Sequence, residues 1–427
     1  MLELGVIADD LTGGLMVASL LEREGVCCPL VTSAEALDRL DNRAEAVVVG
    51  CRLRLAAPSQ AAAEARSIGE ALLGKQARRL YYKYSALFMS TEQGNIGPVS
   101  EALMKLTGAE RVLFCPQWGG VTVYMGRAFV NQVMLHECGA SRDPVTPMTN
   151  SNLVEVLQAQ SQAKVGFLPL ATMRGDNLAA QAYLTQQASN GIKFFIADGI
   201  NQDTDVARIA ELCVDAPLST GADGLPVYLA RAWQQGQQKP EPQTLLPPAP
   251  GYVAVLAGSC SNKTNQQLEL FEQQHPLYRV DLLRAANSPD EVDRIVDWAK
   301  DKLEAGALGI STTMDANGVE HVQKVLGQQG AADLAARILG NVTARLYELG
   351  VRKFVVAGGE TSGTVINTLG VDQLQVAPFD YLGGGYCHAR APVPVSLVTK
   401  AGGQGEADFF QAALERLATA DEQNIAD

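Results

Sequence analysis

Apolar and polar positions alternate along this chain in blocks whose lengths are typical of strands and helices. Short apolar runs at residues 2–8, 26–31, 46–50 and 111–115 predict buried strands. Longer segments between them, such as residues 59–74 and 98–107, carry apolar positions at helical spacing. Strands that alternate with helices favour mostly parallel sheets covered on both faces, so the chain is expected to have an α/β fold.

The same alternation restarts after a stretch with a different composition. Residues 234–250 are rich in Gln and Pro and show no periodicity, which is typical of an interdomain linker. The chain is therefore expected to form a domain over residues 1–233 and a second domain over residues 251–427. A length of 427 residues agrees with two domains.

Paired acids end the first predicted strand. Asp9 and Asp10 are followed by an expected turn at residues 11–14 and an expected helix at residues 15–24. Paired carboxylates at a strand end can bind a substrate hydroxyl, remove its proton or hold Mg²⁺. A helix N-cap pair near Thr12 is the alternative, because acids are common where helices begin.

Further polar side chains follow the next strands of the first half. Arg54 and Lys83 come after apolar runs and would suit the carboxylate of an acidic substrate, although each would also suit a surface salt bridge. Ser90 and Asn95 lie in a polar turn before a helix and would add hydrogen-bond donors to the same carboxylate.

Three glycine-bearing turns each follow a predicted strand in the second half. They span residues 258–264, 358–363 and 400–405, and a helix is expected from Thr364. Glycine lets the backbone approach a ligand, and the free N–H groups of a helix N-terminus favour an anion, so the set predicts a nucleotide or other phosphate ligand. Tight turns without a ligand remain the alternative. The chain has neither a G-x-x-x-x-G-K-[ST] motif nor an early G-x-G-x-x-G motif.

Charge and composition restrict the partners. A net charge of −13 argues against nucleic acid or an anionic membrane surface as the main partner. No apolar run approaches the ~20 residues of a membrane span, and the acidic N-terminus is unlike a signal peptide. The eight cysteines lack C-x-x-C pairing and the four histidines lack metal-ligand spacing, so we expect a cytoplasmic protein with reduced thiols and no protein-bound metal. The oligomeric state stays open, a homo-oligomer included.

Several spaced motifs together resemble the four-carbon acid sugar kinase family, nearest its 3-oxo-tetronate kinase branch. They are G-V-I-A-D-D-L-T-G at the N-terminus, S-T-E-Q-G-N-I-G-P-V at 90–99, D-P-V-T-P-M-T-N-S-N-L at 143–153, G-S-C-S at 258–261 and G-G-E-T-S-G at 358–363. The resemblance runs in order over nearly the whole chain. It implies two α/β domains with an interdomain cleft, a small sugar acid as substrate, and ATP with Mg²⁺.

The resemblance also implies roles for individual residues. Asp9, Asp10, Arg54 and Lys83 match positions on the sugar-acid side of the family. We expect Asp10, beside Asp9, to activate the acceptor hydroxyl, and Arg54 and Lys83 to bind the carboxylate with help from Ser90 and Asn95. The positions that match ATP contacts of the family are Ser259, Gly358, Gly359, Glu360, Thr361, Gly402 and Gly403.

The chain departs from the family pattern mainly in its first half. Met16 and Met89 stand where the pattern has acids, and Asp223 stands in G-A-D-G-L where the pattern has G-x-S-G-L. C-P-Q-W-G-G likewise replaces C-P-A-F-P, and the terminal turn K-A-G-G-Q-G replaces K-S-G-N-F-G. The exchange of two acids for two thioethers removes charge and hydrogen-bonding capacity. The expected function is therefore phosphorylation of the terminal hydroxyl of a sugar acid in an altered pocket. The alternative is a non-catalytic nucleotide-binding or regulatory relative.

Overall fold

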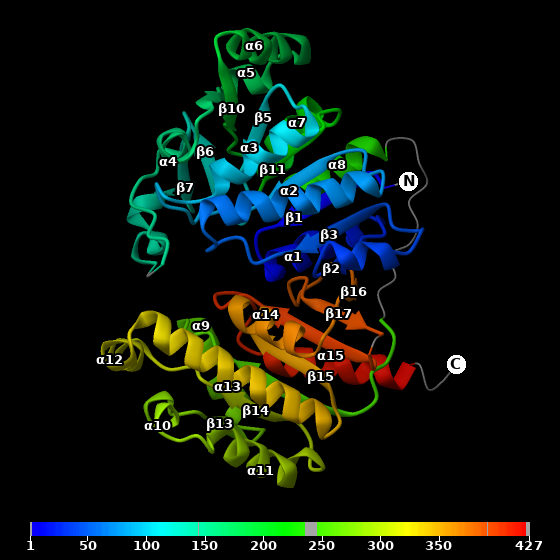
Figure 1. Ribbon diagram of the computed structural model, residues 1–427, viewed down its shortest axis with the longest axis vertical. Coiled ribbons are helices and arrows are strands. Elements are labelled where there is room, and N and C mark those ends of the chain that lie inside the picture. The colour runs from blue at the N-terminus through cyan, green and yellow to red at the C-terminus, as the bar shows by residue number, and fades with distance from the viewer. Residues whose placement is uncertain (1, 144, 235–245, 391, 424–427) are drawn as a thin grey trace. The chain divides into compact units, whose positions relative to one another are not determined.

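The computed structural model describes residues 2–143, 145–234, 246–390 and 392–423 (Figure 1). The chain divides into two compact units, residues 1–242 and 243–427. Most of the expected linker, residues 234–250, lies outside the described residues.

Unit 1 is built on a parallel sheet with the strand order β2-β3-β1-β4-β11-β5-β10-β9. Its strands are β1 Leu4–Ala8, β2 Leu30–Val31, β3 Ala46–Gly50, β4 Leu80–Lys83, β5 Val112–Cys115, β9 Lys164–Leu168, β10 Ile192–Ala197 and β11 Leu218–Gly221. Its helices are α1 Leu11–Arg23, α2 Pro58–Gly74, α3 Ile96–Thr107, α4 Leu153–Gln160, α5 Leu170–Arg174, α6 Asn177–Ser189, α7 Gln202–Cys213 and α8 Leu225–Trp233. Short 3₁₀ helices lie at η1 Glu35–Arg39, η2 Leu135–Glu137 and η3 Gly139–Arg142.

A small antiparallel meander accompanies this sheet and was not predicted. Its strands are β6 Val121–Tyr124, β7 Arg127–Val130 and β8 Val133–Met134. The two connecting turns place Met125, Gly126, Asn131 and Gln132 at positive φ, which is the geometry of two-residue hairpins. Only one of these four residues is glycine, so the usual sequence signal of such turns is weak.

Unit 2 is built on a sheet with the order β13-β14-β12-β15-β18-β17-β16. In this sheet β17 pairs antiparallel with both β18 and β16, and the other neighbouring strands pair parallel. Its strands are β12 Tyr252–Ala257, β13 Leu277–Arg279, β14 Leu308–Ser311, β15 Val351–Ala357, β16 Gln373–Val376, β17 Tyr386–Ala389 and β18 Val395–Lys400. Its helices are α9 Asn262–Glu272, α10 Leu282–Ala286, α11 Glu291–Leu303, α12 Ala316–Leu326, α13 Gln328–Glu348, α14 Gly359–Thr368 and α15 Phe409–Gln423. The expectation of α/β folding on mostly parallel sheets is confirmed.

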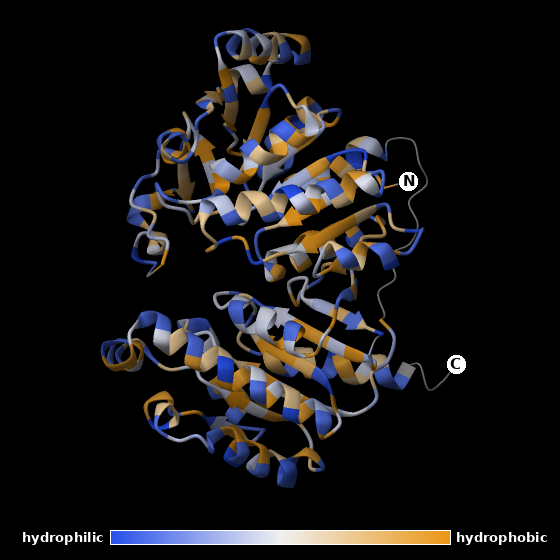
Figure 2. Ribbon diagram, in the orientation of Figure 1, coloured by the Kyte–Doolittle hydropathy of each residue, from blue (hydrophilic) through white to orange (hydrophobic). Residues whose placement is uncertain are grey.

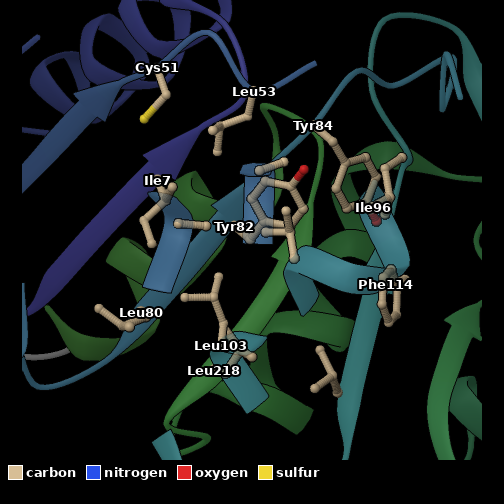
Figure 3. Packing of buried hydrophobic residues seen from close by; sticks show 14 of the residues in the cluster. Ile7, Cys51, Leu53, Leu80, Tyr82, Tyr84, Ile96, Leu103, Phe114 and Leu218 are labelled. Carbon is tan, nitrogen blue, oxygen red and sulfur yellow. The ribbon is translucent and has the colours of Figure 1, made fainter. Parts of the chain in front are cut away.

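Burial explains why the sequence forms these layers. The strands are apolar along their length, whereas the helices carry apolar residues on one face only (Figure 2). In unit 1, Ile7, Tyr82, Leu103 and Phe114 belong to one core cluster that packs helices against the sheet (Figure 3). This packing fixes the ends of β1 and β4, where the expected site residues lie.

Three expected boundaries are wrong at functional positions. Residues 11–14 are the first turn of α1 and not a separate turn, because Asp10 caps the helix by accepting a hydrogen bond from Gly13 N at 2.8 Å. Helix α14 begins at Gly359, five residues before the expected start at Thr364. The expected strand at residues 26–31 pairs only at Leu30–Val31.

Candidate functional site

The strand order of unit 1 reverses direction between β1 and β4. The chain leaves β1 through α1 toward β2, and it leaves β4 through α3 toward β5 on the other side. Because both crossovers are right-handed, their helices cover opposite faces of the sheet. Ligands of open α/β sheets bind beyond the carboxyl ends of the strands at such a switch point.

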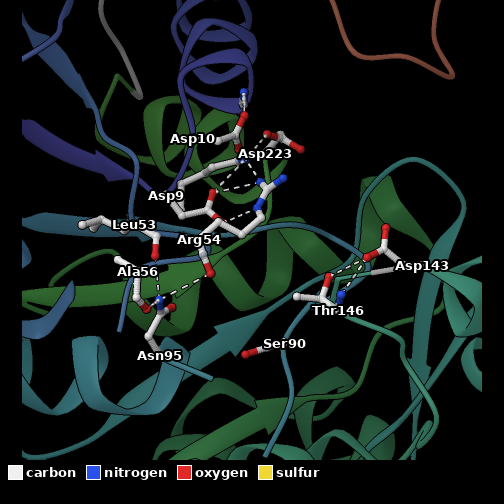
Figure 4. Close-up of polar contacts among 12 residues, drawn as sticks. Asp9, Asp10, Leu53, Arg54, Ala56, Ser90, Asn95, Asp143, Thr146 and Asp223 are labelled. Carbon is white, nitrogen blue, oxygen red and sulfur yellow. Dashed lines mark hydrogen bonds and ion pairs between the residues drawn. The ribbon is translucent and has the colours of Figure 1, made fainter. Parts of the chain in front are cut away.

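An ion network fills this position. Arg54 donates from Nε to Asp9 Oδ2 at 2.9 Å and from Nη2 to Asp9 Oδ1 at 3.1 Å, and its Nη2 also contacts Asp10 Oδ2. Lys83 Nζ lies 3.0 Å from Asp10 Oδ2 and 3.4 Å from Asp9 Oδ1. Asp9 and Lys83 are buried, while Asp10 and Arg54 are each about a quarter exposed. The sequence-predicted Asp9, Asp10, Arg54 and Lys83 therefore meet in one place. Figure 4 shows Asp9, Asp10 and Arg54 of this network.

Local structure holds each of these side chains. Asp10 is fixed as the N-cap of α1, so it serves as both helix cap and network member. The loop that carries Arg54 is tied down because Leu53 N and Arg54 N donate to Asp9 O at 3.0 and 3.2 Å. Gly13 leaves room for the network, since a Cβ added there would lie 1.7 Å from Lys83 Nζ.

The charges of the network are strongly coupled. Burial raises the pKa of Asp10, but Lys83 and Arg54 outweigh burial and hold that pKa well below its ordinary value. Burial lowers the pKa of Lys83, and the three neighbouring carboxylates more than reverse this, so the pKa is raised. Asp10 is therefore ionised and Lys83 charged at neutral pH. A carboxylate of low pKa orients a hydroxyl well and accepts its proton poorly, so Asp10 is suited to positioning an acceptor.

Asn95 supports the network from behind. Its Nδ2 donates to Leu53 O at 2.6 Å, to Ala56 O at 3.0 Å and to Arg54 O at 3.4 Å, so it holds the backbone of the Arg54 loop. Ser90 lies at another point of unit 1. Its Oγ accepts from Gln160 Nε2 at 2.9 Å, and its N–H points to Met148 Sδ at 3.3 Å. The contacts found for Asn95 and Ser90 in the described part of unit 1 are thus with the scaffold.

Asp223 belongs to the network and was not predicted as a site residue. It follows β11, the strand beside β4, and its Oδ1 lies 3.6 Å from Lys83 Nζ. Burial and the acids at 9 and 10 raise the pKa of Asp223, although Lys83 opposes this shift. The sequence signal for Asp223 is the departure of G-A-D-G-L from the family pattern. The strand before this segment, L-S-T-G, has only one large apolar residue, so the sequence did not predict a strand there.

Unit 2 has a corresponding switch point between β12 and β15. The chain leaves β12 through α9 toward β13 on one side, and it leaves β15 through α14 toward β16 on the other. The carboxyl ends of the strands are level, because Ala257 pairs with Ala357 and Ala357 pairs with Lys400. The three glycine-bearing turns therefore begin at the same edge of the sheet.

Direct contacts join these turns. A Cβ added at Gly402 would lie 2.1 Å from Ser259 Oγ, and one added at Gly258 would lie 2.3 Å from Thr361 Oγ1. Ser261 Oγ donates to Gly402 O at 2.6 Å. The sequence-predicted Ser259, Gly358, Thr361 and Gly402 thus lie together, and larger residues would fill the space between them.

The start of α14 supplies donors to this corner. Gly358 is the N-cap at φ 123°, a conformation that favours glycine. Among the hydrogen bonds of the described residues, none uses the N–H of Gly359, Glu360 or Thr361. Free N–H groups and the helix dipole make this end suitable for a phosphate. Glu360 and Gly403 are exposed beside it.

Lys400 is the buried cation of unit 2 nearest these turns. Its Nζ donates to Gly402 O at 2.9 Å, Thr264 Oγ1 at 3.0 Å and Ala401 O at 3.1 Å, so it holds the terminal turn. Burial, with a smaller effect of Lys263, lowers the pKa of Lys400 to about 8. Sequence reasoning took only the glycines of this turn and missed the lysine.

A fourth strand end borders the same corner. β14 ends at Ser311, which pairs with Ala257, and the buried hydroxyls of Thr312 and Thr313 have no hydrogen-bond partner among the described residues. Asn265 Nδ2 donates to Met314 O at 3.1 Å, which ties this turn to α9. These hydroxyls extend the polar lining beyond the three predicted turns.

Neither a cluster of metal-binding side chains nor a membrane-spanning helix is found among the described residues. The part of the chain that the structure describes contains no group of three or more His, Cys, Asp or Glu side chains that could hold a metal ion. It also contains no helix that is both long enough and apolar enough to cross a membrane.

Comparison with known sequences decides the family. Residues 4–229 match a family described as a sugar-binding N-terminal domain, and residues 254–410 match one described as a nucleotide-binding C-terminal domain. This chain belongs to the four-carbon acid sugar kinase family.

Relatives of this family match nearly the whole chain. A 3-oxo-tetronate kinase of Burkholderia multivorans is 35% identical, and one of Pseudomonas fluorescens is 36% identical, each over 97% of both chains. A crystal structure from Salmonella typhimurium LT2, provisionally described as a tRNA synthase, has a TM-score of 0.84 and 31% identity over 97% of this chain and 99% of that one. A Haemophilus influenzae protein of known structure has a TM-score of 0.74 and 27% identity over 96% and 98% of the two chains.

Membership of this kinase family makes the chain a phosphotransferase with an alcohol group as acceptor. The nucleotide-binding match covers the segments that carry Ser259 and Gly358, so this kinase uses a nucleotide held in unit 2.

Proposed function

We propose that this kinase transfers the γ-phosphate of ATP to the terminal hydroxyl of a small sugar acid. The observation that carries the proposal is the pair of switch points. One holds an ion network suited to an acidic polyol, and the other holds a glycine corner suited to a triphosphate. The names of the relatives, which are 3-oxo-tetronate kinases, support a short sugar acid as the acceptor class.

In unit 1, Asp10 would orient the acceptor hydroxyl while Arg54 binds the carboxylate of the acid. Arg54 suits this role because its side chain is 27% exposed and its Nη1 forms no hydrogen bond among the described residues. Lys83 helps to keep Asp10 ionised, and Asn95 keeps the Arg54 loop in place. Phosphoryl transfer depends mainly on positioning and charge neutralisation, so a strong general base is unnecessary.

In unit 2, the N–H groups of Gly359 to Thr361 would receive phosphate oxygens, and Gly258 and Gly402 would let the nucleotide approach the backbone. Lys400 would fix the terminal turn and add positive charge. Mg²⁺ would enter with the triphosphate, because it prefers phosphate oxygens, waters and one or two carboxylates to a cage made by protein. Glu360, exposed at the N-terminus of α14, is the carboxylate nearest at hand in sequence.

The proposal includes an acid pocket altered at two positions that depart from the family pattern, Met16 and Met89. Met16 is buried in α1, one helical turn beyond Gly13, and Met89 is half-buried in the loop before α3. Thioethers at both positions favour an acceptor with fewer hydroxyl groups or more apolar surface than a tetronate. The pocket change and the exact acid are the parts of the proposal that need experiment.

The test is ATP turnover by the full-length chain against four- to six-carbon sugar acids, with 3-oxo-tetronate included. We expect ADP formation with at least one acid, and we expect the turnover of 3-oxo-tetronate to be weaker than that of this acid. Met16→Asp combined with Met89→Asp is expected to raise turnover of 3-oxo-tetronate. If ATP binds by calorimetry and no acid gives a phosphorylated product, the chain is a nucleotide-binding relative without kinase activity.

A further inference from the structure

The network of unit 1 carries more negative than positive charge before any substrate binds. Among the described residues, the ion pairs of Asp9, Asp10 and Asp223 are with two cations, Arg54 and Lys83. With all five ionised, the net charge is one negative in a largely buried site. A second carboxylate placed there would add like charge where the effective dielectric constant is low, which is unfavourable.

The cations have little binding capacity left. Lys83 is 3% exposed, and its Nζ is surrounded by the three carboxylates. Arg54 uses Nε and Nη2 for Asp9 and Asp10, which leaves the Nη1 edge for a ligand. One carboxylate of a substrate can therefore be paired, at Arg54.

Asp223 is the acid with acceptor capacity to spare. Asp9 accepts from two nitrogens of Arg54, and Asp10 accepts from Gly13 N, Lys83 and Arg54. Asp223 Oδ1 is buried and has no hydrogen-bond partner among the described residues, with Lys83 Nζ 3.6 Å away. Its side chain is 14% exposed. A buried acceptor without a donor is costly, so a ligand that donates to Asp223 removes a penalty and adds a charged hydrogen bond.

The surroundings of Asp223 limit what that donor can be. The charged groups with the largest effects on the pKa values of Arg54 and Lys83 are all members of this network. An ammonium group satisfies this setting, because it balances the charge and donates hydrogen bonds.

We infer that Asp223 is a specificity-determining residue that selects a zwitterionic acceptor, a short hydroxy acid that also carries an amino group. The carboxylate binds at Arg54, the ammonium binds at Asp223, and the hydroxyl lies at Asp10. This inference rests on the proposed function, and it narrows the substrate class from sugar acids to amino-hydroxy acids.

The experiment compares two ligands that differ in one group. Calorimetry with the full-length chain measures the dissociation constants of 2-amino-3,4-dihydroxybutanoate and 2,3,4-trihydroxybutanoate. The wild type is expected to bind the amino acid about 10- to 100-fold more tightly, the range expected for a charged hydrogen bond. Butanetetrol, which has no carboxylate, is expected to bind more weakly than the amino acid.

Two variants identify Asp223 as the cause. Asp223→Asn keeps the shape and removes the charge, and Asp223→Ser restores the residue of the family pattern. Both are expected to lose the preference for the amino acid, and Asp223→Ser is expected to bind the trihydroxy acid more tightly than the wild type does. Thermal melting confirms that both variants are folded.

The inference is overturned if the wild type binds the trihydroxy acid or the tetrol as tightly as the amino acid. It is also overturned if the preference survives in Asp223→Ser. Because binding is measured without turnover, this outcome is separate from that of the proposed function. If the preference follows Asp223 but neither acid is phosphorylated, the role of Asp223 stands and the proposed reaction does not.

Discussion

Gly402 and Ser259 lie so close that a single methyl group cannot be added between them. A Cβ at Gly402 would lie 2.1 Å from Ser259 Oγ and 3.1 Å from its Cβ. The two residues come from opposite ends of unit 2 and meet because β12, β15 and β18 end at the same level. This contact joins the first and last of the three turns that the sequence predicts to hold a nucleotide.

Gly402→Ala is expected to raise the KM for ATP. Overpacking typically costs about 1–3 kcal/mol, which corresponds to roughly 5- to 100-fold in affinity. The matched control is Gly330→Ala in α13, because the nearest atom that a Cβ there meets is Leu326 Cβ at 3.9 Å, an ordinary contact. Steady-state kinetics with ATP varied checks both variants. Equal effects of the two substitutions would contradict a nucleotide site at Ser259 and Gly402.

Gly13→Ala is expected to raise the KM for the acid and leave the KM for ATP unchanged. The added methyl group would lie 1.7 Å from Lys83 Nζ and 2.8 Å from Asp10 Oδ2, so the network must shift. Gly74→Ala is the control, since a Cβ there has no neighbour within 4 Å and alanine suits the end of α2. Initial rates with each substrate varied in turn separate the two constants. A change confined to ATP would show that the network does not bind the acceptor.

These two predictions show what could be read from the sequence. Asp9, Asp10, Arg54 and Lys83 were found because each follows a clearly apolar run, and parallel strands bring their carboxyl ends together. Ser259, Gly358 and Gly402 were found for the same reason. The contacts between the turns could not be predicted, because they depend on the register of strands far apart in the sequence.

Asp223, the start of α1 and Lys400 were harder to predict from the sequence. Asp223 was missed as a site residue because β11 is too poor in apolar residues to be recognised as a strand. The helix start at Leu11 was missed because the two glycines after Thr12 suggested a turn, whereas the N-cap bond of Asp10 overrides their low helix propensity. Lys400 was overlooked because its importance comes from burial, which the sequence does not report.

The pKa of Lys400, about 8, predicts a pH dependence of ATP use. Below pH 8 the side chain is protonated, and as the pH rises through 8 it loses its charge and one donor to the terminal turn. The value of kcat/KM for ATP, which reports on the free enzyme, is therefore expected to fall as the pH rises above about 8. Lys400→Met is expected to show a low kcat/KM without this break. If the break in the pH profile persists in Lys400→Met, the group that titrates is not Lys400.

Glu22 predicts a pH dependence of stability in unit 1. Burial raises the pKa of Glu22 from 4.5 to about 7. The negative charge of Glu45 adds to this rise, and the hydrogen bond from Cys28 N opposes it. An acid whose pKa is raised on folding binds its proton more tightly in the folded state, so its ionisation destabilises the fold at high pH.

Glu22→Gln removes this charge and keeps an oxygen to accept from Cys28 N. It is expected to increase the free energy of unfolding by up to about 3 kcal/mol above pH 7, and to have no effect below about pH 4.5. Urea unfolding at several pH values, with Glu45→Gln as the comparison, measures this. A gain in stability that is equal at all pH values would not come from the ionisation of Glu22.

The most direct test of the account is ³¹P NMR of the full-length chain with ATP, Mg²⁺ and the acid that it turns over best. We predict a new phosphomonoester signal that requires both ATP and the acid, and that is lost in Asp10→Asn, which keeps the helix cap. Release of inorganic phosphate alone, or an unchanged phosphomonoester signal in Asp10→Asn, would contradict the assignment of acceptor to unit 1 and nucleotide to unit 2.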